Sequence, residues 1–262
     1  MKLLQMKPYV VFLTSIFILI SPALTNAQKS GAIPELLQEF FLSETVFPQQ
    51  KNELQLTARP TFWKNKNLSY LQIPVWLEYG FTNRFQVELT VPVRIMFPRG
   101  QKPVADTRTL EAGLLYNIVN RNKPFALSAG LDIEWATAKD EEEIGEVKSR
   151  IAWEPIIIIA RQFGRTQVHA NLGAELIGNE AEFPYGLATA TSLGHWIITM
   201  EITGEMHDNK TIFLSPGLIW KGIDDFELGA GVSKGRSIWG LTLMATYELP
   251  LGTPARHLNK IL

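Results

Sequence analysis

The sequence predicts an all-β fold, a transmembrane antiparallel β-barrel of about 12 strands with both chain termini on the periplasmic side. Three observations predict this fold. Apolar residues occupy every second position in repeated runs of strand length, most clearly from Phe85 to Ile95. The connections between these runs are alternately short and long. The chain also begins with a stretch that is typical of an export signal.

Residues 1–27 are expected to be a signal peptide. Lys2 and Lys7 form a basic start, residues 9–20 form an apolar core, and small residues follow up to Ala27. The apolar core is about a dozen residues long, whereas a membrane-spanning helix needs roughly 20. Cleavage before Gln28 is therefore favoured over an uncleaved membrane anchor.

Residues 28–51 come before the first alternating run. Within them the stretch IPELLQEFFLSE, residues 33–44, clusters leucines and phenylalanines at a spacing that suits a short amphipathic helix. Two placements of this segment stay open. It is either a periplasmic lead-in to the barrel or a plug that folds into the barrel.

Twelve alternating runs follow, and they assign the barrel itself to residues 52–251. They lie near residues 53–63, 70–81, 85–97, 110–119, 125–137, 149–161, 167–177, 186–193, 196–206, 211–221, 226–233 and 239–249. An even number of strands is the rule in bacterial outer-membrane barrels. Connections after even-numbered runs are short, such as residues 82–84, and several after odd-numbered runs are long, such as residues 98–108. In such barrels the short turns face the periplasm and the long loops face outward, and residues 252–262 are expected to be a C-terminal tail.

A water-soluble β-sandwich also alternates, but two features favour a membrane barrel. The lysines sit mainly in turns and chain ends instead of covering a solvated strand face. Aromatic residues gather at both ends of the runs, as in the girdles at the two membrane interfaces. The expected outward girdle holds Trp63, Phe97, Trp135, Trp153 and Trp239, and the inward one holds Tyr79, Phe85, Phe125, Phe163, Trp196, Trp220 and Phe226. Prolines conflict with regular strands, so bulges or strand ends are expected at Pro60, Pro74, Pro92, Pro155 and Pro216.

The face opposite the apolar one carries charges, which are expected to line the barrel lumen. A basic residue facing lipid at the bilayer midplane would cost on the order of 2–4 kcal/mol, and an acid somewhat less. The expected acids are Glu78, Glu88, Glu111, Asp132, Glu134, Glu154, Glu175, Glu201, Glu205, Glu227 and Glu248, and the bases are Arg59, Arg94 and Arg150 with His169. Because acids exceed bases, such a lumen favours cations. The alternative is that the carboxylates pair with the arginines or take up protons and simply fill the barrel.

Composition and motifs exclude several other classes of protein. The 25 basic residues against 26 acidic ones leave no basic excess for binding nucleic acid. The sequence has no cysteine, which excludes disulfides, thiolate metal sites and thiol catalysis. It also lacks a glycine-rich phosphate loop, an H-E-x-x-H motif and EF-hand spacing. No cofactor, no metal site and no enzymatic activity are therefore expected.

Two loop sequences have both a functional and an ordinary interpretation. His207 and Asp208 are the best candidates for a hydrolase pair at the outer rim, but HDNK is common turn composition. The acidic run from Asp140 to Glu143 suits divalent cations that bridge surface lipopolysaccharide, although such a run is more often a hydrated loop. His169 is expected to face the lumen without an adjacent serine on its strand, and His195 and His257 lie in a turn and in the tail.

The stretch YLQIPVWLEYGFTNRFQVELTVPVRI, residues 70–95, resembles the meta-pathway phenol-degradation family of outer-membrane proteins. Its turn from Tyr79 to Arg84 is similar to that family's Y-G-hydrophobic-T-(D/N)-R turn, and Val91 and Pro92 match the V-P that ends the following strand. With its two flanks the resemblance covers about a third of the mature chain. It implies an outer-membrane barrel associated with the uptake of aromatic compounds, and it brings no binding residues.

The sequence thus predicts a channel in the outer membrane of a Gram-negative cell that passes small aromatic or cationic solutes by passive diffusion. The expected partners are membrane lipid and lipopolysaccharide, the small-molecule solute, and the machinery that assembles outer-membrane barrels. Two alternatives stay open: a closed barrel with a structural or adhesive role, and a hydrolase at the outer rim.

Overall fold

The computed structural model describes residues 33–66, 68–98, 102–106, 109–119, 123–136, 151–206 and 212–251. Several of the expected features lie outside the described residues. They are the signal peptide of residues 1–27, the acidic run 140–143, Arg150, the pair His207 and Asp208, His257 and the tail of residues 252–262.

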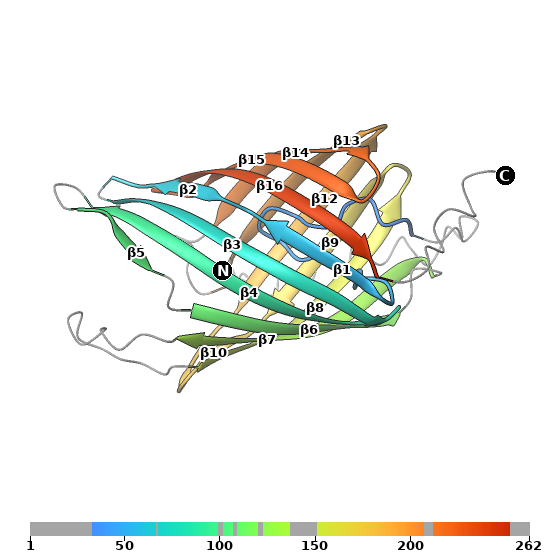
Figure 1. The fold of residues 1–262 in the computed structure, drawn as a ribbon, viewed down its shortest axis with the longest axis horizontal. Helices are drawn as coiled ribbons and strands as arrows, with labels where there is room; N and C mark the ends of the chain where they lie inside the picture. The colour runs from blue at the N-terminus through green and yellow to red at the C-terminus, as the bar shows by residue number, and fades with distance from the viewer. Residues whose placement is uncertain are drawn as a thin grey trace, which may run out of the picture.

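The described chain forms one closed antiparallel β-barrel (Figure 1). Its strands are β1 (Glu53–Ala58), β2 (Thr61–Lys64), β3 (Leu68–Thr82), β4 (Phe85–Pro98), β5 (Val104–Asp106), β6 (Thr109–Val119), β7 (Phe125–Ala136), β8 (Ile151–Phe163), β9 (Thr166–Gly173), β10 (Glu175–Ile177), β11 (Glu180–Glu182), β12 (Pro184–Leu193), β13 (Trp196–Glu205), β14 (Phe213–Ile223), β15 (Phe226–Lys234) and β16 (Trp239–Pro250). Of these 16 strands, β1 and β2 are two parts of one wall strand and β5, β10 and β11 are short additions, which leaves twelve wall strands. The barrel closes because β1 and β2 pair with β16 on one side and with β3 on the other. The predicted twelve-stranded antiparallel barrel is confirmed.

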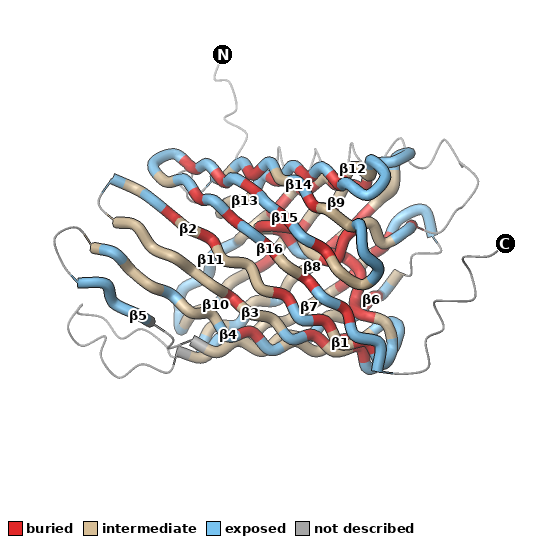
Figure 2. Tube along the Cα trace, turned by 45° about the horizontal axis from the view of Figure 1, so that its top comes forward, coloured by how far each residue is buried: buried red, intermediate tan, exposed pale blue. Residues whose placement is uncertain are grey.

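Side chains alternate between the two faces of the wall, as the sequence pattern predicts (Figure 2). On β16, Thr242, Met244 and Thr246 are buried within the barrel while Leu241 and Leu243 are exposed on its outside. The other strands likewise expose large apolar side chains, such as Leu89 on β4 and Ile157 on β8. An apolar outer belt around a closed wall is the architecture of an outer-membrane protein, because closure leaves no unpaired strand edge in the lipid.

The two ends of the barrel differ in the length of their connections. Two-residue turns join β3 to β4, β8 to β9, β12 to β13 and β14 to β15. Gly164, Gly194 and Asp225 in these turns have φ of 60°, 69° and 61°, which glycine adopts freely and aspartate tolerates. We call this end the turn end, and the opposite end the loop end. Glu53 pairs with Pro250, so the wall begins and finishes at the turn end. That this end faces the periplasm stays a prediction.

The five prolines within the predicted runs all lie where a ladder with a neighbouring strand is interrupted. Pro60 separates β1 from β2, and Pro74 lies between the two ladders that these strands form with β3. Pro92 lies where β4 stops pairing with β6 and before it pairs with β5. The β8–β9 and β14–β15 ladders are likewise interrupted at Pro155 and Pro216. Since proline has no N–H to donate, Pro74, Pro92, Pro155 and Pro216 each lie where one ladder is interrupted while the pairing with the other neighbour continues. At Pro60 the ladders with both neighbours are interrupted.

Two sequence-based expectations are wrong. The stretch of residues 33–44 forms no helix and runs as an irregular chain, because its apolar side chains pack against the barrel wall instead of along one helix face. Trp63 does not face the lipid as a member of an interface girdle would. It is only 8% exposed and contacts Phe213 inside the barrel, with ring centroids 5.4 Å apart. Thr61 and Trp63 share the inward face of β2, and Phe62 takes the outward position. No helix within the described residues is long and apolar enough to cross a membrane.

The two faces of β4 should differ sharply in their tolerance of a charge. Leu89 is 42% exposed on the outer belt, whereas its neighbour Glu88 lines a cavity inside the barrel. We expect Leu89→Arg to destabilise the folded barrel by about 2–4 kcal/mol, because the charge meets lipid. Glu88→Arg places the same side chain among carboxylates and should assemble far better. The heat-modifiable gel shift of folded barrels in membrane fractions measures both variants, and equal yields of folded protein would contradict the assigned facing.

Candidate functional site

Residues 33–50 lie inside the barrel and form the main feature of its lumen (Figure 1). We call them the luminal segment. Its apolar side chains are almost fully buried against the wall, and they are Ile33, Leu37, Phe40, Phe41, Val46 and Phe47. Hydrogen bonds to strands on different sides of the barrel show that the segment runs round the inside of the wall before it enters β1.

Glu201 on β13 holds the middle of the luminal segment. The backbone N–H of Phe41 donates to Oε1 of Glu201, and the N–H groups of Leu42 and Ser43 donate to Oε2, each at 2.8 Å. Glu201 is 0% exposed. A carboxylate that accepts three backbone N–H bonds satisfies donors that would otherwise be buried without partners, and each bond is strengthened by the negative charge.

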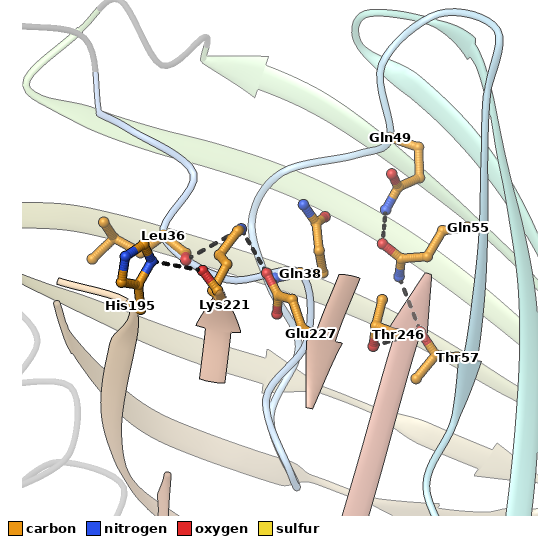
Figure 3. Close-up of polar contacts among 9 residues, drawn as sticks. All are labelled: Leu36, Gln38, Gln49, Gln55, Thr57, His195, Lys221, Glu227 and Thr246. Atoms are coloured by element: carbon orange, nitrogen blue, oxygen red, sulfur yellow. Dashed lines mark hydrogen bonds and ion pairs between the residues drawn. The ribbon is translucent and has the colours of Figure 1, made fainter. Parts of the chain in front are cut away.

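A second carboxylate holds the start of the segment (Figure 3). Glu227 on β15 accepts the N–H of Gln38 at 3.2 Å and forms an ion pair with Lys221 on β14 at 2.6 Å. The Lys221 ammonium also donates to the carbonyl of Leu36 at 3.5 Å. The lysine therefore links the buried Glu227 to the segment backbone and neutralises its charge.

Amide side chains hold the end of the segment beside β1, β3 and β4. The N–H of Gln49 donates to Gln86 at 2.7 Å, and Gln86 in turn donates to Glu78 at 2.6 Å. Gln55 accepts from the Gln49 amide at 2.7 Å and donates to both Glu78 and Glu39 (Figure 3 shows the Gln49 bond). Enclosure in the barrel, and then the nearby carboxylate of Glu44, raise the pKa of Glu39 well above its usual range.

Polar wall side chains also bond the segment's carbonyl groups. Asn171 on β9 donates to the Glu44 carbonyl at 3.0 Å, and Ser128 on β7 donates to that of Val46 at 2.5 Å. Arg59, between β1 and β2, donates to the Phe40 carbonyl at 2.9 Å. The wall thus satisfies backbone groups along the whole segment, as groups enclosed away from water require.

Phe41 fits into a hollow made by glycines of the wall. A Cβ atom added to Gly217 on β14 would lie 2.1 Å from the Phe41 ring, and one added to Gly229 or Gly231 on β15 would lie 2.9 or 3.1 Å from it. These three positions face the lumen and have no side chain, so the ring rests against the wall backbone. Glycine is required at these positions because the Phe41 ring approaches the wall backbone closely, and not because the backbone conformation needs it.

Carboxylates surround a cavity of about 190 Å³, which we call the acidic cavity. Its charged lining consists of Glu44, Glu88, Glu111, Asp132, Glu154 and Arg59. The Arg59 guanidinium lies 4.4 Å from the centre of the Trp76 ring, which also lines the cavity. Five acids therefore share one arginine.

A second cavity of about 290 Å³ adjoins the first, since both are lined by Glu44, Glu154 and Ile156. We call it the Asn171 cavity. It lies among β8, β9, β12 and β13, and its polar lining consists of Ser43, Glu44, Glu154, Asn171, Tyr185, Thr203 and Glu205. Glu154 and Glu205 stand near the loop end of β8 and β13, so the cavity extends toward that end of the barrel.

Acids of neighbouring strands stand directly opposite one another. Glu111 pairs with Glu134, Asp132 pairs with Glu154, and Glu78 pairs with Glu88. Like charges at directly paired positions destabilise a sheet. This arrangement is therefore not explained by strand pairing alone. No group of three His, Asp or Glu residues suited to hold a metal ion occurs within the described ranges.

The sequence-predicted lumen residues fall into three groups. Arg59, His169 and Glu201 contact the luminal segment directly, His169 through ring contacts with Phe40 and Phe47 at 5.0 and 6.4 Å between centroids. Glu78 joins them through Gln55 and Gln86. The acidic cavity brings together Glu88, Glu111, Asp132 and Glu154, and Glu205 lines the Asn171 cavity. Glu227 belongs with the residues that contact the luminal segment, and Glu248 is buried at the cross-strand position of Gln55.

The third group lines neither cavity. Arg94 is exposed and lies 5.7 Å from the Tyr70 ring, Glu134 is exposed, and Glu175 pairs with Glu182 on the β10–β11 hairpin. Arg150 lies outside the described residues.

Sequence reasoning missed several residues of the lumen. Ser43, Glu44 and Glu39 belong to a segment without strand periodicity, so no alternation could assign their facing. Asn171 and Gln86 share the inward face of their strands with His169 and Glu88. The alternation that found the charged residues would have found these amides as well.

Comparison with known proteins supports the fold. No family model and no curated protein matches the chain. The resemblance to the phenol-degradation family therefore stays a prediction.

Among solved structures, the chain is similar to the COG4313 outer membrane channel from Pseudomonas putida F1, with 10% identity and a TM-score of 0.56 over 78% of this chain and 98% of that one. It is also similar to the KdgM porin in complex with disordered oligogalacturonate, with 10% identity and a TM-score of 0.54 over 74% and 98% of the two chains. A NanC porin gives 7% identity and a TM-score of 0.51 over 74% and 100%. The chain thus has the barrel fold of outer-membrane porins and channels.

Removal of the Glu201 carboxylate should release the middle of the luminal segment. In Glu201→Ala the N–H groups of Phe41, Leu42 and Ser43 lose their acceptor, at a cost of about 1–3 kcal/mol for each buried donor. Hydrogen–deuterium exchange of the peptide that covers these residues should become much faster, while strand peptides stay protected. Glu134→Ala removes an exposed carboxylate as a control. Unchanged protection in Glu201→Ala would show that the segment is held by packing alone.

The glycine hollow gives a graded test of the Phe41 contact. Gly217→Ala should cost about 1–3 kcal/mol by overpacking, because its Cβ would overlap the ring. Gly231→Ala, whose Cβ would lie 3.1 Å from the ring, should cost clearly less. Urea unfolding followed by tryptophan fluorescence measures both, and equal stabilities of the two variants would contradict this seat for Phe41.

Proposed function

We propose that the protein is an outer-membrane channel that passes small cationic and aromatic solutes by passive diffusion through an acidic lumen. The observation that carries the proposal is the acidic cavity, where five carboxylates share a single arginine. A pore wall lined by carboxylates concentrates cations and repels anions. The fold shared with outer-membrane channels is consistent with transport.

The cross-strand acid pairs support the same proposal. A barrel that needed only stability would not place Glu111 against Glu134 and Asp132 against Glu154. Water and passing cations in the lumen would screen the repulsion between these acids. The acids would then attract cations into the lumen, which is their role in the proposed transport. Other carboxylates serve the luminal segment instead, among them Glu201 and Glu227.

Two observations support the passage of aromatic solutes. The Trp76 ring lines the acidic cavity beside apolar Ile156 and Ile158, which offers a contact for a flat apolar group. The turn from Tyr79 to Arg84 resembles that of the phenol-degradation family. Membrane lipid and lipopolysaccharide surround the barrel in this proposal, and the expected barrel assembly machinery inserts it.

A closed barrel with a structural or adhesive role is the second candidate. The luminal segment favours it, because its bulky side chains and wall hydrogen bonds occupy part of the lumen. No described residue supports the rim hydrolase, whose candidate pair lies outside the described ranges.

Ion selectivity in planar bilayers tests the channel. Reversal potentials should show cation selectivity at about 0.1 M salt that weakens toward 1 M, because the Debye length falls from ~10 Å to ~3 Å. The double variant Glu88→Gln/Asp132→Asn should lower the selectivity. Glu180→Gln/Glu182→Gln removes two acids from the exposed β11 and should change it much less. Anion selectivity would refute the acidic lumen, and folded protein without conductance would favour the closed barrel.

A further inference from the structure

We propose that the Asn171 cavity is a binding site for a small polyhydroxylated solute that carries a protonated amine, such as an amino sugar. This inference rests on the proposed channel and names the class of solute that would dwell in it.

The cavity is built by the register of four wall strands. Asn171, Gly186 and Thr203 are consecutive cross-strand partners on β9, β12 and β13, so they form one row along the inner wall. The adjoining β8 contributes Glu154 and Ile156 to the lining. Gly186 leaves this row hollow at its centre. A Cβ there would lie 3.1 Å from the Ser43 hydroxyl and would narrow the space above Asn171. Gly173 likewise keeps the space beside Glu154 open, because a Cβ added to it would lie 3.3 Å from the Glu154 carboxylate.

Two buried side chains that line this cavity have polar atoms without a partner in the described part of the chain. They are the Ser43 hydroxyl and the Asn171 amide oxygen. Ser43 is 4% and Asn171 5% exposed, so bulk water does not solvate them freely. The Asn171 amide is fixed in direction, because its nitrogen donates to the Glu44 carbonyl at 3.0 Å. A buried polar atom left without a partner is unfavourable, and a ligand that supplied one would recover that loss.

The chemistry of these groups selects the ligand. The Asn171 oxygen can only accept, and the Ser43 hydroxyl can accept or donate. Glu44 and Glu154 add carboxylates, which also accept. A fitting solute must therefore offer several N–H or O–H donors, and a positive charge on one of them would be stabilised by the carboxylates. The volume of about 290 Å³ lies at the small end of ligand pockets, near the size of a single sugar ring.

Calorimetry with three sugars of similar shape tests the site. Titration of D-glucosamine, D-glucose and D-glucuronate into detergent-solubilised protein at about 0.1 M salt needs no open pore. Glucosamine should bind saturably, glucose about tenfold more weakly because it lacks the ammonium, and glucuronate not measurably. Equal binding of glucosamine and glucose, or no binding of glucosamine, would overturn the proposal.

Two variants locate the binding within the barrel. Glu154→Gln removes a carboxylate of the Asn171 cavity and should weaken glucosamine about tenfold. Glu134→Gln makes the same change of charge at a residue that lines neither cavity and should weaken it less than about twofold. Ser43→Ala removes one unpartnered atom with little risk to folding and should also weaken binding. Equal losses in Glu154→Gln and Glu134→Gln would show a diffuse charge effect and refute the site.

The outcome is separable from that of the channel itself. Conductance without glucosamine binding would refute the site and leave the channel standing. Glucosamine binding to folded protein that conducts nothing would refute the channel, and would assign the Asn171 cavity to capture of the solute instead of its passage.

Discussion

The structure depends on one constraint: a chain segment enclosed by a barrel must find partners for its backbone N–H and C=O groups on the wall. The Glu201 carboxylate meets this constraint at the middle of residues 33–50, where it accepts three consecutive backbone N–H groups. Glu227, Gln86, Asn171 and Ser128 meet it elsewhere along the segment. Each buried backbone group without such a partner would cost about 1–3 kcal/mol, which is as much as the burial of one large apolar side chain contributes.

This constraint divides the polar residues of the inner wall between two tasks. Glu201 and Glu227 are committed to the luminal segment and are thereby unavailable to a solute. Glu88, Glu111, Asp132 and Glu154 have no such commitment and surround a cavity. Glu44 belongs to both regions, since its backbone is held by Asn171 while its side chain reaches both cavities. The luminal segment therefore shapes the space that solutes would use and supplies part of its charge.

The wall accommodates several local departures from regular pairing because its overall register is fixed by closure. Four of the five prolines interrupt a ladder on one side only, so the strand keeps a continuous neighbour on the other, and Pro60 alone marks a break that divides one wall strand into β1 and β2. Three glycines remove side chains where Phe41 meets the wall, and two more leave the Asn171 cavity open. The missing side chains thus make room for the Phe41 ring in the first place and for the cavity in the second, and the alternating pattern alone requires neither.

The sequence by itself determined the barrel, its strand boundaries to within a few residues, and the alternation of side chains between the two faces of each strand. It could do so because lipid outside and polar space inside impose a period of two on every strand. The same period identifies Glu88 and Glu201 as inward-facing. It cannot show that Glu88 lines a cavity while Glu201 accepts hydrogen bonds from the backbone of the luminal segment. Only the tertiary structure decided that, because the partners of Glu201 come from a segment about 160 residues away with no periodicity of its own. For the same reason residues 33–44 resembled a helix in sequence and proved irregular in the barrel, where the curved wall replaces a helix's own hydrogen bonds.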